Sequence, residues 1–151
     1  NMLRLKPAEE FFKIAKEKNI AIIVRVPLAS GLLTGKMNTN SSFPENDHRN
    51  YNIKGEAFDV GETFSGVDFS KALEVVEELK SLIPEGFSLS QLALKWILMH
   101  DEVSVVIPGA KNSDQALKNI SASALPNIPN LMEKIENIYN THLKNDIHPR
   151  W

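Results

Sequence analysis

The segment from Ile107 to Asn119 combines a proline–glycine turn, a flexible cation and the predicted start of a helix. It follows the apolar run Val103–Val106, so a strand is expected to end in this turn. Gly109 leaves the backbone uncovered, and Lys111 adds a positive charge. The first turn of a helix also attracts anions through its free amides and its dipole. The segment therefore predicts an anion site that suits a phosphate group.

A second loop with similar chemistry follows another apolar run, Ile20–Val26. The loop Pro27–Lys36 holds two glycines, two hydroxyl side chains and a lysine within ten residues. Glycine permits close approach of the backbone to a ligand, and hydroxyls and lysine can bind phosphate oxygens. Gly31 and Gly35 are spaced too closely for a Walker A loop. An ordinary turn between a strand and a helix remains the alternative interpretation of this loop.

Helical and strand-like patterns alternate along the chain and position both loops. Proline favours the first turn of a helix and serine its N-cap. Helices are predicted from Pro7 to Lys18, from Asp68 to Leu82, after Ser88, from Ser113 or Asp114 to Ile120, and from Pro129 onward. Strands are predicted over Ile20–Val26 and Val103–Ile107. Two buried parallel strands cannot cover their own edges, so this α/β pattern is expected to be part of a larger fold.

The stretch 37–66 is polar and rich in Asn, Ser, Gly and Pro, with no clear periodicity. Long insertions of this kind inside a compact domain are often functional. A flexible linker is the equally weighted alternative.

Composition limits the classes of function that remain. The chain lacks cysteine, which excludes disulfides and thiolate metal sites and agrees with a cytoplasmic location. The formal net charge of -2 gives no basic excess for nucleic acid. No apolar stretch approaches the length of a membrane span, and no spacing of histidines predicts a metal site.

The two loops together carry a family resemblance. Pro-Leu-Ala-Ser-Gly-Leu-Leu-Thr-Gly-Lys at 27–36, and Ile-Pro-Gly-Ala-Lys at 107–111 followed by Gln115 and Asn119, resemble the loops after strands seven and eight of the aldo-keto reductases. The resemblance implies an α/β fold that is the C-terminal portion of a (β/α)8 TIM barrel, from about strand 6 to strand 8. It implies a single partial domain over 1–151, in which 37–66 is a long loop covering the cofactor.

The cofactor implied by the resemblance is NADP. Lys111 would pair with the 2′-phosphate, Gln115 and Asn119 would meet the adenine, and the other positions would line the pyrophosphate, ribose and nicotinamide. The full set of implied cofactor-binding residues is Arg25, Val26, Pro27, Leu28, Ala29, Ser30, Leu32, Lys36, Arg49, Gly109, Lys111, Gln115 and Asn119. Arg25 stands where the family usually has an aromatic residue under the nicotinamide.

In the intact enzyme the resemblance implies NADPH-dependent reduction of an aldehyde or ketone to an alcohol. The catalytic Asp, Tyr, Lys and His of the family come from earlier strands, so no catalytic residue is assigned here and the chain alone is expected to be inactive. The expected partners are a nicotinamide nucleotide, a small carbonyl substrate in the intact enzyme, and a second copy of the chain through exposed barrel edges. A non-catalytic nucleotide-binding or regulatory module and an inert structural fragment are the alternatives.

Overall fold

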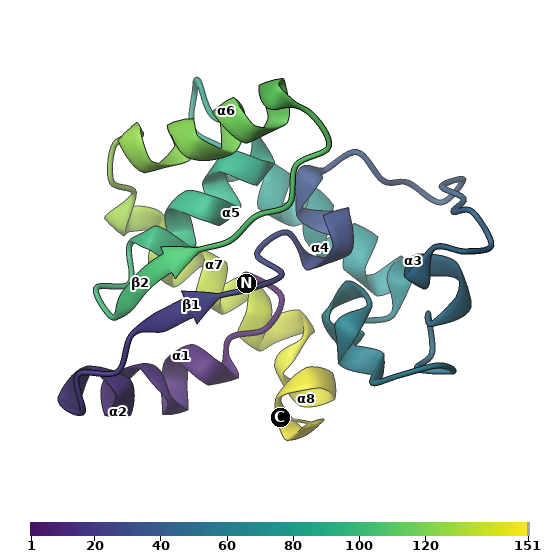
Figure 1. The fold of residues 1–151 in the computed structure, drawn as a ribbon, viewed down its shortest axis with the longest axis horizontal. Coiled ribbons are helices and arrows are strands. Elements are labelled where there is room, and N and C mark those ends of the chain that lie inside the picture. Colours follow the sequence, from purple (N-terminus) through teal and green to yellow (C-terminus); the bar gives the residue numbers. More distant parts are fainter. Residues whose placement is uncertain (151) are drawn as a thin grey trace.

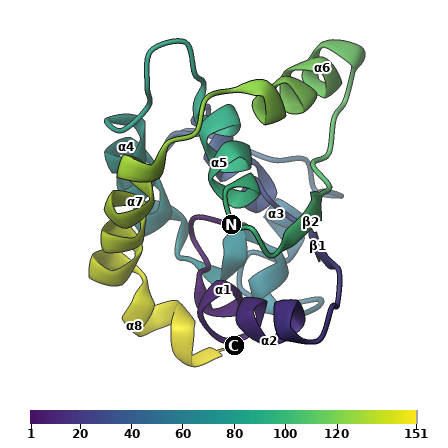
Figure 2. The same ribbon diagram turned by 90° about the vertical axis from the view of Figure 1, so that its left-hand side faces the viewer.

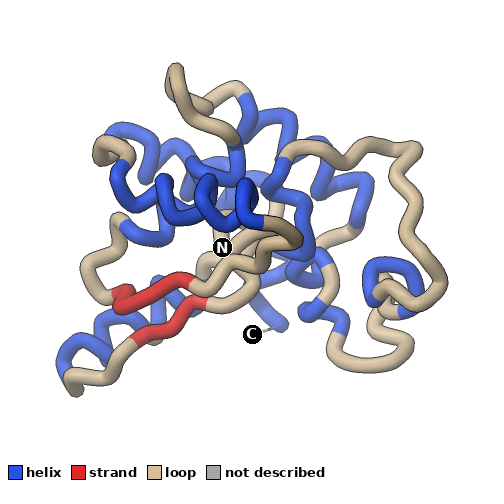
Figure 3. The backbone as a smooth tube through the Cα atoms, turned by 45° about the horizontal axis from the view of Figure 1, so that its top comes forward, coloured by secondary structure: helices blue, strands red, loops and turns tan. Residues whose placement is uncertain are grey.

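The computed structural model describes residues 1–150 and shows a small parallel sheet packed against helices (Figure 1). Strand β1 (Ile22–Val24) pairs in parallel with β2 (Val103–Val106), and a long helical crossover joins the two. Figure 3 shows the two strands side by side with the remaining chain almost wholly in helices and loops. The α/β prediction is confirmed, with both strands shorter than expected.

The strands are short because the backbone leaves the extended conformation early. The register shifts between Ile22 and Ile23, and Val26 has a φ of 51°, a left-handed conformation that ends the strand. The predicted strand Ile20–Val26 was therefore too long at both ends. The predicted strand Val103–Ile107 was too long by one residue, although the Ile107 amide still donates to the Val24 carbonyl oxygen at 3.0 Å.

The predicted helix from Pro7 to Lys18 forms as two consecutive segments, α1 (Lys6–Glu10) and α2 (Phe12–Glu17). The Phe11 amide still donates to the Pro7 carbonyl oxygen at 3.0 Å across the junction. Proline stands at the start of α1, where its missing amide is not needed. The two segments therefore act as one element beside β1.

Two crossover helices contribute a large share of the core. The Asp68 side chain caps α4 (Phe69–Lys80) by accepting from two amides, and Ser88 and Gln91 form a reciprocal capping box at the start of α5 (Leu89–Leu98). Both caps satisfy amides that the helix itself leaves free. The largest fully buried apolar residues include Phe64, Leu79, Leu92, Ile97, Ile135, Tyr139 and Leu143.

The remaining helices follow β2. Helix α6 (Ser113–Ser121) comes after the loop at 107–112, and α7 (Pro129–His142) packs against α4. Helix α8 (Lys144–Ile147) brings Lys144 within 3.2 Å of Glu9 on α1. Figure 2 shows α7 and α8 on one side of the molecule and the sheet on the other.

The stretch 37–66 is folded, which makes the flexible-linker alternative wrong for this structure. It contains α3 (His48–Tyr51) and two 3-10 turns, Val60–Glu62 and Phe64–Gly66. The buried Asn52 side chain accepts from the amides of Ala57 and Phe58 and donates to Thr63 Oγ1 at 3.1 Å. Local side-chain bonds of this kind replace the missing periodic structure.

One face of the sheet remains open. Ile22, Val24 and the β2 residue Val106 face the core, whereas Ile23 on β1 is 63% exposed and Val105 on β2 is 42% exposed. Parallel sheets are normally covered on both faces. Within residues 1–150 no helix is long and apolar enough to cross a membrane.

Candidate functional site

The parallel register brings both predicted loops to one edge of the sheet. Val24 is paired with Val106, so the carboxyl ends of β1 and β2 leave the sheet side by side. The loop that begins at Val26 and the loop that begins at Ile107 therefore start next to each other, although about 80 residues separate them in sequence. In open parallel sheets, ligands bind in the crevice outside these strand ends.

The backbone after β1 is unusually strained. Val26, Ala29 and Ser30 have φ angles of 51°, 47° and 55°, and Gly31 follows at 98°. Non-glycine residues rarely adopt this region, and a β-branched residue such as valine does so least. Each such residue costs on the order of 1–3 kcal/mol and persists where the surroundings enforce it. Strain of this kind concentrates at ligand-binding sites.

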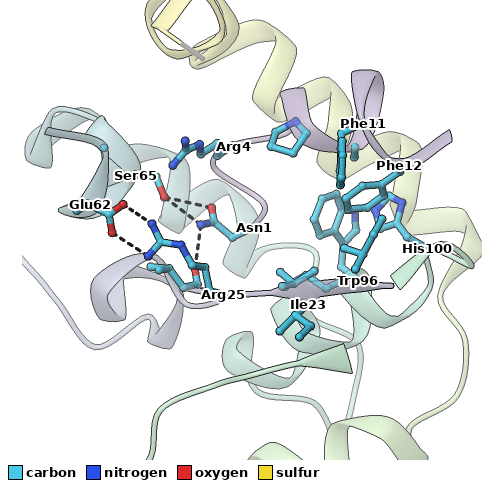
Figure 4. A pocket seen from close by; sticks show the side chains of 17 residues that line it. Asn1, Arg4, Phe11, Phe12, Ile23, Arg25, Glu62, Ser65, Trp96 and His100 are labelled. Carbon is cyan, nitrogen blue, oxygen red and sulfur yellow. Dashed lines mark hydrogen bonds and ion pairs between the residues drawn. The ribbon is translucent and has the colours of Figure 1, made fainter. Parts of the chain in front are cut away.

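Asn1 holds the strained turn in place. Its Nδ2 donates to the Val26 carbonyl oxygen at 3.0 Å and to Ser65 Oγ at 2.9 Å. Ser65 has a left-handed φ of 58°. One asparagine thereby ties the end of β1 to the long loop (Figure 4).

The hydroxyl groups of the turn are already engaged. Ser30 Oγ accepts from the Phe64 amide at 3.1 Å and donates to the Glu62 carbonyl oxygen at 3.3 Å. Thr34 Oγ1 donates to the Gly31 carbonyl oxygen at 2.7 Å. In this structure both hydroxyls therefore donate to carbonyl oxygens of the fold.

Several predicted site residues are core residues. Ala29 and Leu32 are fully buried, Pro27 is buried and Leu28 is half-buried. Their side chains fill the interior beneath the turn. The three buried side chains are therefore covered, which leaves only the backbone of Pro27, Ala29 and Leu32 for a ligand above the turn.

Arg25 and Glu62 form an ion pair at the edge of the site. Arg25 Nη1 lies 3.0 Å from Glu62 Oε2, and Arg25 Nη2 donates to Glu62 Oε1 (Figure 4). The hydrogen bonds from Arg25 hold the pKa of Glu62 below its usual range, and the same bonds raise the pKa of Arg25. The cation at this position is therefore neutralised by an adjacent carboxylate.

Arg49 lies against the same turn. A Cβ added to Gly31 would be 3.6 Å from Arg49 Nη1, so the two residues are neighbours. The guanidinium also stacks over the Phe43 ring and bonds both carboxylate oxygens of Asp47, with Nη2 2.6 Å from Oδ2. The bond from Arg49 keeps the pKa of Asp47 well below its usual range. A bound anion would share this guanidinium with Asp47.

The second loop is open to solvent. Gly109 and Lys111 are exposed, and nothing lies within 4 Å of a Cβ added to Gly109. Lys36 of the first loop is exposed as well. The site thus offers two accessible lysines.

The two amide side chains on α6 point back onto their own loop. Gln115 Oε1 accepts from the Lys111 amide at 2.8 Å, and Asn119 Nδ2 donates to the Gly109 carbonyl oxygen at 3.2 Å. Both side chains therefore brace residues 109–111, a role that their spacing on one helix face did not predict. Asn112 caps the helix by accepting from the Gln115 amide.

Three site residues were not identified from the sequence. Asn1 and Glu62 act through partners 25 to 64 residues away, and His48 Nε2 lies 3.4 Å from Ser30 Oγ. No local pattern indicates contacts at such separations. Among the described residues, no group of three or more His, Cys, Asp or Glu could hold a metal ion.

Comparison with known proteins gives a consistent picture. The family model described as "Aldo/keto reductase family" matches residues 1–140. Aldo-keto reductase str7 of Strobilurus tenacellus is 31% identical over 120 residues, which is 79% of this chain and 33% of that protein. Aldo-keto reductase yakc [NADP(+)] of Schizosaccharomyces pombe is 28% identical over 118 residues, 78% of this chain and 32% of that protein.

A solved structure agrees in fold. The glycerol dehydrogenase AKR11B4 from Gluconobacter oxydans superimposes with a TM-score of 0.74 at 24% identity, covering 97% of this chain and 42% of that one. The chain thus spans about a third of the length of these two curated relatives and forms part of a (β/α)8 barrel.

Proposed function

From the premise that this chain belongs to the aldo/keto reductase family, we propose that it supplies the NADP-binding C-terminal part of a carbonyl reductase. In the whole enzyme, NADPH would reduce an aldehyde or ketone to an alcohol, with the cofactor supplying the hydride. The residues of this chain would bind and orient the nucleotide. The related yakc protein has NADP(+) in its name, which supports the choice of cofactor.

The observation that carries the proposal is the meeting of two anion-compatible loops at the carboxyl ends of β1 and β2. The strained turn at Val26–Gly31 and the loop at 107–111 start side by side, and Lys36 and Lys111 are exposed cations. This combination fits a dinucleotide with several phosphates. The proposed contacts are Arg25, Val26, Pro27, Leu28, Ala29, Ser30, Leu32, Lys36, Arg49, Gly109, Lys111, Gln115 and Asn119.

Some of the proposed residues would contact the cofactor through the backbone and others through the side chain. The buried residues of the turn would act through backbone groups. Lys111 would meet the 2′-phosphate, while Gln115 and Asn119 would keep the 109–111 segment open beside it and offer their remaining polar atoms to the adenine. Paired with Glu62, the guanidinium of Arg25 would present a planar surface of reduced net charge to the nicotinamide. We further propose that the folded stretch 37–66 covers the cofactor.

The test is a titration of the pure chain with NADPH and with NADH, in which nucleotide fluorescence reports binding. We expect NADPH to bind more tightly, because only it carries the 2′-phosphate. Lys111→Ala should weaken NADPH binding about tenfold and leave NADH binding unchanged, as expected for the loss of one charge-assisted contact. Lys118→Ala on the same helix is the matched control. Equal affinities for NADPH and NADH in the unaltered chain would count against the assignment.

We also propose that the chain has no catalytic activity by itself. The pure chain should reduce no carbonyl substrate, because none of its residues corresponds to the catalytic Asp, Tyr, Lys or His of the family.

We also propose that the chain self-associates through its open apolar surface. This surface includes Val105 and Ile107 and the α6 residues Leu117 and Ile120. Light scattering over a range of concentrations measures this association, and a strictly monomeric chain would refute it.

A further inference from the structure

His48 lies against the strained turn of the proposed cofactor site, although it is not one of the proposed contacts. It is the first residue of α3 in the long loop (Figure 1), and Asp47 caps this helix by accepting from the Arg49 amide. His48 Nε2 lies 3.4 Å from Ser30 Oγ, and Arg49 lies beside Gly31. Two consecutive side chains of α3 are thus directed at two consecutive residues of the turn.

Asp47 determines which nitrogen of the neutral His48 ring carries the hydrogen. His48 Nδ1 lies 3.5 Å from Asp47 Oδ1, so the ring hydrogen faces this carboxylate. In the neutral ring Nε2 is then a hydrogen-bond acceptor. It becomes a donor when the ring is protonated, because both nitrogens of an imidazolium carry hydrogens.

The contact between His48 and Ser30 has no hydrogen to share while the ring is neutral. Ser30 Oγ accepts from the Phe64 amide at 3.1 Å and donates its one hydrogen to the Glu62 carbonyl oxygen at 3.3 Å. A protonated Nε2 can donate to this hydroxyl oxygen, or to a phosphate oxygen beside it. The His48 side chain is 39% exposed, so a ligand and a proton can both reach it.

Two ion pairs border His48, and each pair is neutral. Asp47 faces it from the N-cap of α3 and is paired with Arg49. Glu62 lies further along the long loop and is paired with Arg25. A positive charge on His48 lowers the pKa of both carboxylates, after the larger effect of the hydrogen bonds from their arginine partners. A bound pyrophosphate adds negative charge to these neutral surroundings, and a proton on His48 offsets part of it.

We propose that His48 binds the pyrophosphate of the nicotinamide nucleotide as an imidazolium, so that nucleotide binding takes up a proton at this residue. The inference rests on the proposed function, because it concerns the same site. The pyrophosphate would lie between the turn at Ser30 and α3. Because His48 belongs to the stretch 37–66, its protonation would also hold this stretch over the nucleotide. Affinity should therefore rise as the pH falls through the range in which histidine gains its proton.

The test compares nucleotide binding by the pure chain at about pH 6 and about pH 8, on either side of the usual histidine range. The first probe is NADH, whose fluorescence reports binding and which lacks the 2′-phosphate, a group that itself titrates near pH 6. NADPH is measured in parallel, and the titration of its 2′-phosphate is common to the unaltered chain and the variants. We expect about tenfold tighter binding at the lower pH, as for the gain of one charge-assisted hydrogen bond.

Two substitutions of His48 separate its charge from its other contacts. His48→Gln keeps a polar side chain without a titratable charge, so binding should be weak at both pH values. His48→Arg carries a permanent charge, so binding should be tight at both. His142→Gln is the matched control, because the His142 side chain is also 39% exposed and pairs with Glu78 on α4, and it should keep the full pH dependence. Circular dichroism at both pH values shows whether each variant folds.

The outcomes distinguish this inference from the proposed function. Nucleotide binding that does not change with pH in the unaltered chain, or that changes equally in His48→Gln, would overturn the role of His48 and leave the proposed function standing. A pH dependence that persists in His48→Arg would assign the proton to another group and overturn it as well. Absence of saturable binding of NADH and of NADPH at both pH values would overturn the proposed function together with the inference.

Discussion

The Arg25 guanidinium and the Glu62 carboxylate are joined by two hydrogen bonds that tie the end of β1 to the loop at 37–66. This pair links the proposed nicotinamide position to the segment proposed to cover the cofactor. It lies next to the turn whose strained backbone is held by Asn1. Because the Arg25 side chain is 62% exposed, the pair is expected to determine local order more than global stability.

Replacing Glu62 by Gln should loosen the loop without unfolding the protein. Exposed ion pairs contribute at most about 1 kcal/mol, so the urea midpoint should fall only slightly. Limited proteolysis within 37–66 should become faster. Glu77→Gln, which removes the exposed pair with Lys80 inside α4, is the control and should leave loop cleavage unchanged. Identical cleavage of the Glu62 variant and the unaltered chain would contradict this role.

Loop order should decrease in acid. The arginine partners Arg25 and Arg49 lower the pKa values of Glu62 and Asp47 in the folded state. A lowered carboxyl pKa contributes stability that is present above the ordinary carboxyl pKa of about 4 and is lost as pH falls through the folded value. Proteolysis of 37–66 should therefore accelerate below about pH 4. Glu62→Gln should weaken this dependence, and an unchanged pH profile in that variant would refute it.

His100 should make the whole fold sensitive to mild acid. Burial lowers the pKa of its imidazole from the usual 6.5, against Phe12 and Trp96, whose ring centroids are 5.5 and 4.7 Å away. The unfolded chain then binds a proton more readily than the folded one, so stability is full above pH 6.5 and falls as the pH is lowered. Melting temperatures of the unaltered chain should drop between pH 7 and pH 5. His100→Phe should flatten this interval while preserving the ring packing, and an equal drop in the variant would show that another group is responsible.

Asn52 should be the most sensitive polar residue of the long loop. Its side chain is fully buried and makes bonds to Ala57, Phe58, Asp59 and Thr63. Asn52→Ala leaves buried polar groups unpaired and should cost about 2–3 kcal/mol in urea unfolding. Asn50→Ala, which removes one exposed bond of 3.3 Å to the Phe43 carbonyl oxygen, should cost far less. Similar losses for the two variants would show that the Asn52 bonds do not organise the loop.

The sequence by itself determined where the longer helices begin and which family the chain resembles. Helices begin at Pro7, Asp68, Ser88 and Pro129 within one or two residues of the structure because caps and proline act locally. The two glycine-containing loops were recognised for the same reason, since their residues are contiguous.

Only the tertiary structure decided what these residues contact. The predicted strand 20–26 is shortened by the left-handed turn at Val26, which Asn1 and Ser65 help to hold. Gln115 and Asn119 brace their own loop, and Arg25 is paired with Glu62. Periodicity and capping report on neighbours within about one helical turn. Hydrogen bonds between residues tens of positions apart depend on how the chain packs. The partners of each site residue were therefore known only from the tertiary structure.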